Sequence, residues 1–137
     1  MLVQITIYFH VLGAVAMGFY LLLPFFLQKA LLQNRSVLHV FYWMNFISQW
    51  VLVIQLLTGG YLYMLGDYSL MWIISVSVVY TAIGAFGGLF GYHIRKFLQS
   101  SSPSALDPWM RKVRFHAILT TVSMLVMMIL MLFPYAI

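Results

Sequence analysis

Four long apolar stretches separated by short polar breaks dominate the chain. Each stretch exceeds the roughly 20 residues that an α-helix needs to cross the hydrocarbon core of a bilayer. Short breaks favour an antiparallel bundle, in which each helix returns beside the one before it. The sequence therefore predicts an all-α integral membrane protein, a single four-transmembrane-helix bundle over residues 1–137, with helices at about 2–32, 37–65, 70–98 and 109–135.

The composition supports this prediction. Hydrophobic residues make up 64% of the chain and charged residues 7%, against about 45–50% and about 25% in ordinary soluble domains. The mean hydropathy is +1.00, so a soluble globular domain is excluded. The chain has no cysteine, which excludes disulfides, thiolate-bound metal centres and covalently attached c-type haem.

The basic residues fall only around the first and third breaks. By the positive-inside rule, these two breaks are expected to be cytoplasmic loops of a multi-pass protein in the cell membrane, with both termini and the Asp67 loop outside. This placement explains the net charge of +5 through contact with the lipid bilayer, so no nucleic-acid partner is expected. The basic residues are Lys29, Arg35, Arg95, Lys96, Arg111, Lys112 and Arg114.

One histidine falls in each apolar stretch: His10, His39, His93 and His116. A histidine inside a membrane span is costly and is a functional hypothesis by default, although hydrogen bonding between helices is the simpler alternative. Three of the four are predicted to lie toward the basic loops, where they could converge. His10 is predicted to lie nearer the opposite face.

Two histidines on different helices, a dry interior and a basic rim suit haem b, because two neutral imidazoles can bind iron from opposite faces. His39 and His116 are the favoured iron ligands, with His93 and His10 as alternatives. The propionates would pair with arginines, although the same arginines are expected in any protein of this topology. The candidate propionate partners are Arg95, Arg111 and Arg114.

The third apolar stretch carries a glycine-rich run, in which Gly84 and Gly88, and also Gly87 and Gly91, are four residues apart. This spacing is typical of close helix packing. The missing side chains could also make room for a flat macrocycle.

Polar residues in the second stretch, Asn45, Ser48, Gln49 and Gln55, predict a hydrogen-bonded strip between helices or a subunit contact rather than a cofactor site. The fourth stretch carries methionines that could bind haem iron or copper through sulfur, although such residues more often fill gaps in packing. These methionines are Met124, Met127, Met128 and Met131.

Only two carboxylates occur, Asp67 and Asp107, and both lie in polar breaks. A proton relay of carboxylates inside the membrane is therefore not expected. The sequence also has no hydrolase, metalloprotease or phosphate-binding motif. The sequence points to no catalytic residue, and if the protein is an enzyme, the class that its histidines favour is a membrane haem-dependent oxidoreductase.

Residues 5–18, ITIYFHVLGAVAMG, followed by LLLP at 21–24, resemble the first helix of a group of small bacterial four-helix membrane proteins. The group includes the HemJ-type protoporphyrinogen oxidases and the CopD-like copper-resistance proteins. The resemblance covers about 20 residues. It implies a haem b protein in which His10, on the first helix, binds the haem.

The leading functional hypothesis is a haem b protein that transfers electrons with a quinone or a porphyrin-like partner, with quinone as a possible second cofactor. One alternative is a non-catalytic membrane subunit or assembly factor, whose histidines and glycines serve helix contacts. Another is a copper carrier with histidine and methionine ligands. Self-association or a partner membrane subunit is also expected.

Overall fold

The computed structural model describes residues 1–27, 34–99 and 106–137, and the described residues are helical with short connections. The helices are α1 (Leu2–Ala16), α2 (Phe19–Phe26), α4 (Arg35–Met64), α5 (Leu70–Gln99) and α6 (Leu106–Leu132). They provide four apolar segments long enough to cross a membrane, with α1 and α2 together forming the first. The prediction of an all-α, four-span membrane protein is confirmed.

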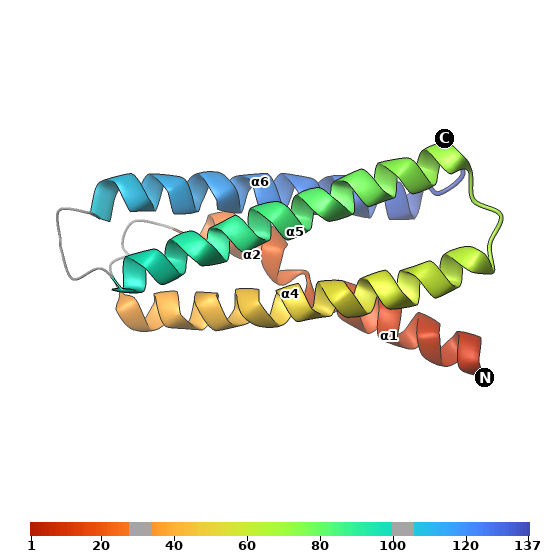
Figure 1. Cartoon of the computed structure of the whole chain (residues 1–137), viewed down its shortest axis with the longest axis horizontal. Helices are drawn as coiled ribbons and strands as arrows, with labels where there is room; N and C mark the ends of the chain where they lie inside the picture. Colours follow the sequence, from red (N-terminus) through yellow and green to blue (C-terminus); the bar gives the residue numbers. More distant parts are fainter. Residues whose placement is uncertain (28–33, 100–105) are drawn as a thin grey trace.

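The long helices α4, α5 and α6 run side by side along the molecule (Figure 1). Both termini and the turn between α4 and α5 lie at one end of the bundle, as an antiparallel arrangement requires. The opposite end, where α5 ends and α6 begins, carries the arginines and lysines of the described residues and is called the basic end below. The end of the predicted first helix, residues 28–32, and Gln33 of the first break lie outside the described residues, as do residues 100–105 of the third break.

The first span is two helices rather than one. The break falls at Met17 and Gly18, where hydrogen bonds link residues three apart, as in a 3₁₀ turn. A Cβ atom at Gly18 would lie 2.9 Å from the carbonyl oxygen of Val15, so the tight turn requires glycine. The break thus falls six residues before Pro24, which lies inside α2.

The break sends the two halves of the first span to different neighbours. α1 packs against α4, whereas α2 packs against α6. Figure 1 shows α2 passing behind α5 toward α6 and α1 lying along α4 near the N-terminus. The core gathers around α2, since Tyr20 and Leu23 are fully buried together with Phe90 and Ile94 of α5.

Most of the remaining surface is apolar, as expected for helices that face lipid. At the end with the termini, however, aromatic residues pack on one another. The ring of Tyr68 stacks on Trp72 at 4.6 Å and on Tyr135 at 5.9 Å. The indole Nε1 of Trp72 also donates a 2.8 Å hydrogen bond to the carbonyl oxygen of Leu130. This cluster ties α5 to α6 and is typical of the aromatic belt at a membrane interface.

Candidate functional site

His93 of α5 and His116 of α6 form a close pair near the basic end. Their ring centroids are 4.7 Å apart and the ring planes are inclined by 36°. Both side chains are half-buried, at the edge of the tight contact between α5 and α6. His93 lies six residues before the end of α5, about 9 Å along the axis at about 1.5 Å per residue. The pair is thus within reach of the membrane interface.

The hydrogen bonding of the two rings is unequal. The Nδ1 atom of His116 lies 2.8 Å from the carbonyl oxygen of Lys112, and a carbonyl can only accept, so Nδ1 carries the proton. In the neutral ring the Nε2 atom of His116 therefore keeps its lone pair. The Nδ1 atom of His93 is buried and, within the described residues, is the one buried side-chain nitrogen or oxygen without a hydrogen-bond partner.

An aromatic ring and a positive charge adjoin this histidine pair. The ring of Trp109, in the first turns of α6, lies 5.6 Å from the ring of His93. The Nζ atom of Lys112 sits 5.2 Å from the centroid of the Trp109 ring, a favourable cation–π contact. The site thus combines the Nδ1 atom of His93, the acceptor nitrogen Nε2 of His116, the flat ring of Trp109 and the ammonium group of Lys112.

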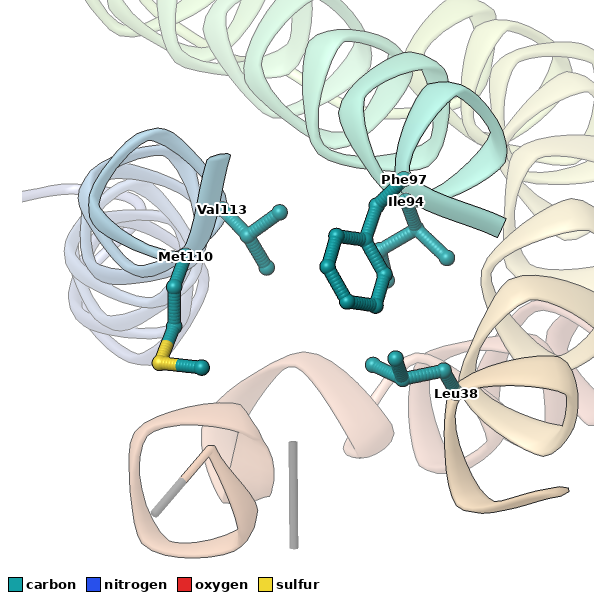
Figure 2. Close-up of a pocket in the computed structure, with 5 residues that line it drawn as sticks. All are labelled: Leu38, Ile94, Phe97, Met110 and Val113. Atoms are coloured by element: carbon teal, nitrogen blue, oxygen red, sulfur yellow. The ribbon is translucent and has the colours of Figure 1, made fainter. Parts of the chain in front are cut away.

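Directly beneath the basic end, the interior of the bundle is closed. Figure 2 shows Leu38, Ile94, Phe97, Met110 and Val113 converging from three helices. They enclose about 10 Å³, which is at the limit for one water molecule, and their apolar side chains give it no partner. This space is too small to hold a ligand between the helices.

The convergence of three histidines is not found. Among the described residues, no three histidine or acidic side chains lie close enough to hold one metal ion. His39 is exposed on α4, whose buried face is formed by Leu38, Phe41, Asn45, Ser48 and Leu52. The helix α4 packs mainly on α1 and α5, whereas α6 packs mainly on α5 and α2. The pairing of His39 with His116 as iron ligands stays a prediction.

His10 lies apart from the pair, in the contact between α1 and α4. Its Nδ1 atom is 2.9 Å from the hydroxyl oxygen of Thr58, and that hydroxyl donates to the carbonyl oxygen of Ile54 at 2.8 Å. The hydroxyl therefore accepts from His10, and the Nε2 atom of His10 keeps its lone pair. The side-chain amide of Gln55 donates a 2.7 Å hydrogen bond to the carbonyl oxygen of His10 and so holds this part of α1 against α4.

The polar strip of α4 points into the bundle. The hydroxyl of Tyr20 donates to Asn45 Oδ1 at 3.0 Å and accepts from Gln49 Nε2 at 2.8 Å. The amides of Asn45 and Gln49 pack directly on Gly91 and Gly87. The prediction of an interhelical hydrogen-bonded strip is confirmed, and this glycine face serves close packing rather than a macrocycle.

A second glycine face of α5 is open. A Cβ atom added at Gly84 or Gly88 would meet nothing within 4 Å. This face could receive another helix, so the predicted self-association stays a prediction.

The residues present fit haem only in part. A macrocycle cannot lie between the rings of His93 and His116 in this arrangement. Two iron–nitrogen bonds of about 2 Å each, plus the distance from each nitrogen to the centre of its ring, exceed the 4.7 Å between the two ring centroids. His10 offers a single Nε2 ligand whose ring is fixed by Thr58, as is usual for metal-binding histidines. Of the predicted propionate partners, Arg95 and Arg111 are exposed, and Arg114 donates to the carbonyl oxygen of Leu27 at 3.0 Å.

Sequence reasoning missed Tyr20 and Thr121, which organise the core. Pro24 could have indicated them, because a proline inside a helix leaves the carbonyl oxygen four residues earlier without its usual backbone hydrogen bond. Here the freed carbonyl is that of Tyr20, and it needs a donor from another helix.

Comparison with models of protein families, with curated proteins and with solved structures gives no match to this chain.

Proposed function

We propose that the protein binds the head group of a lipid-soluble hydroquinone at the histidine pair. The observation that carries the proposal is the unpartnered Nδ1 atom of His93 beside a ring whose tautomer is fixed. A phenolic hydroxyl matches both rings, since it can donate to His116 Nε2 and, once the His93 ring turns its buried Nδ1 atom toward the ligand, accept from that atom.

The surroundings favour an aromatic alcohol over a metal ion. Trp109 presents a flat ring beside His93, on which a quinol ring can pack. The ammonium group of Lys112 lies over Trp109 and disfavours a cation, while it favours an oxygen that gains negative charge. The space between the helices at this end is too small for a ligand, so the quinol would lie at the outer edge of α5 and α6, where an isoprenoid tail would remain in the bilayer.

The test is calorimetric titration of the purified protein in detergent with duroquinol under anaerobic conditions. We expect His93→Ala and His116→Ala each to weaken binding at least about ten-fold, or about 1.4 kcal/mol. His39→Ala is the matched control, because His39 is exposed on α4 at the same end. This variant is expected to bind as the unchanged protein does.

Two results would contradict the proposal: no binding of duroquinol to the unchanged protein, or an equal loss in His39→Ala. The variant His116→Asn separates chemistry from folding, since asparagine can occupy the site but does not offer the same acceptor nitrogen. The proposal is supported if His116→Asn unfolds at the same temperature as the unchanged protein but binds duroquinol more weakly.

A second candidate is haem b bound through His10 as a single axial ligand. It is favoured by the hydrogen bond from His10 to Thr58, which leaves Nε2 available, and by the resemblance of residues 5–24 to haem-associated first helices. When bound, haem would supply one-electron chemistry. His10 would hold the iron, and Thr58 would fix the direction of the ring.

This candidate is tested by a pyridine haemochrome assay on protein purified from haem-supplemented cells. We expect bound haem in the unchanged protein and in His116→Ala, and its loss in His10→Ala. Retention of a full Soret band in His10→Ala, or colourless unchanged protein, would overturn the haem assignment. Elemental analysis of a colourless sample for copper then tests the carrier hypothesis.

A further inference from the structure

A cavity of about 260 Å³ lies between α2 and α6, on a different face of α6 from the histidine pair. Its walls are Pro24 and Leu27 of α2 and Arg114 and Ile118 of α6. Pro24 and Ile118 are exposed, so the cavity opens toward the lipid-facing surface.

One charged group lines this cavity. The Nε atom of Arg114 donates a 3.0 Å hydrogen bond to the carbonyl oxygen of Leu27, which caps the end of α2. This bond holds the guanidinium group at the wall through Nε, so that, within residues 1–27, 34–99 and 106–137, its two terminal nitrogens stay available to another acceptor. A fixed guanidinium offers paired donors that match the oxygens of a phosphate.

The position of the cavity selects the kind of molecule that can enter. Its mouth is among lipid-facing residues, and three of its four lining residues are apolar, so the ligand must have an apolar part. Its cation lies near the basic end, six residues after the start of the apolar span Pro108–Leu132, and its long side chain can extend toward the lipid head groups. Basic pockets between transmembrane helices are known to bind anionic lipid head groups.

We propose that this cavity, the Arg114 groove, is a binding site for an anionic phospholipid. The phosphate contacts the terminal guanidinium nitrogens of Arg114, and the upper part of an acyl chain lies against Pro24 and Ile118. The lipid then packs against both α2 and α6, next to the point where the chain leaves α2.

The test is native mass spectrometry of the full chain, titrated in detergent with phosphatidylglycerol or phosphatidylcholine of identical acyl chains. We expect phosphatidylglycerol to bind at least about ten-fold more tightly. Arg114→Gln should reduce this binding at least about five-fold. The matched control is Arg111→Gln, an exposed arginine of the same helix that does not line the groove, and its binding should change less than about two-fold.

Because Arg114→Gln also removes the bond to Leu27, Ile118→Trp provides a second variant that keeps the arginine and fills the groove. We expect it to reduce phosphatidylglycerol binding by a similar factor. Equal binding of the two lipids, equal loss in Arg111→Gln, or full binding in Ile118→Trp would each overturn the proposal. Equal loss in Arg111→Gln would assign the attraction to the general charge of the basic end.

Discussion

The hydroxyl of Thr121 on α6 donates a 2.6 Å hydrogen bond to the backbone carbonyl oxygen of Tyr20 on α2. Pro24 has no N–H group with which to bond this carbonyl inside the helix. Both partners are buried, where an unpaired carbonyl would be costly. The bond therefore allows a proline in the middle of a membrane span and fixes α2 against α6.

Thr121→Val should lower the free energy of unfolding by about 1 to 2 kcal/mol, because it leaves the Tyr20 carbonyl without a partner. The effect should shrink when Pro24 is replaced by alanine, since the restored N–H group can bond the same carbonyl. Denaturation in mixed micelles measures both backgrounds as a double-mutant cycle. Equal costs of Thr121→Val in the two backgrounds would show that Pro24 and Thr121 are not coupled.

Tyr20→Phe should destabilise the protein more than Tyr80→Phe does. The hydroxyl of Tyr20 joins two amides, those of Asn45 and Gln49, and its loss leaves both without this partner at a cost of about 1 to 3 kcal/mol. The hydroxyl of Tyr80 donates only to the carbonyl oxygen of Leu52, which belongs to the interior of α4. Thermal unfolding in detergent compares the variants, and equal shifts would argue against a central role for Tyr20.

Gly91→Ala and Gly88→Ala should behave differently although both lie on α5. A Cβ atom at Gly91 would collide with the amide of Asn45, whereas one at Gly88 would meet open space. We expect Gly91→Ala to cost about 1 to 3 kcal/mol through overpacking, and Gly88→Ala to be neutral or slightly stabilising because alanine favours helix. The same unfolding assay decides, and tolerance of Gly91→Ala would contradict the described contact of α4 with α5.

The four spans were predictable because length and hydropathy alone determine them. The break in the first span was not, since Pro24 is the obvious breaking residue in the sequence. The break at Gly18 depends on two packing partners, with α1 on α4 and α2 on α6. A tight turn there satisfies both contacts, while Thr121 supplies the donor that Pro24 makes necessary.

The candidate site was predicted in its residue types but not in its pairing. Which histidines meet depends on how each helix is rotated, and a uniformly apolar helix gives a weak signal of its inner face. In α4 the signal was present: Asn45 and Ser48 are buried, and His39 lies outside the face they share. In α5 and α6 the pairing of His93 with His116 follows from close packing that the sequence alone does not determine.

The proposed quinol site requires one phenolic oxygen to bond both rings of the histidine pair. The most direct measurement is ¹⁵N NMR of the histidine-labelled protein in micelles, with and without duroquinol. This site predicts that the His93 Nδ1 and His116 Nε2 resonances shift together on titration, while those of His39 do not. Shifts confined to His39, or no shift of either ring of the pair at saturating duroquinol, would contradict it.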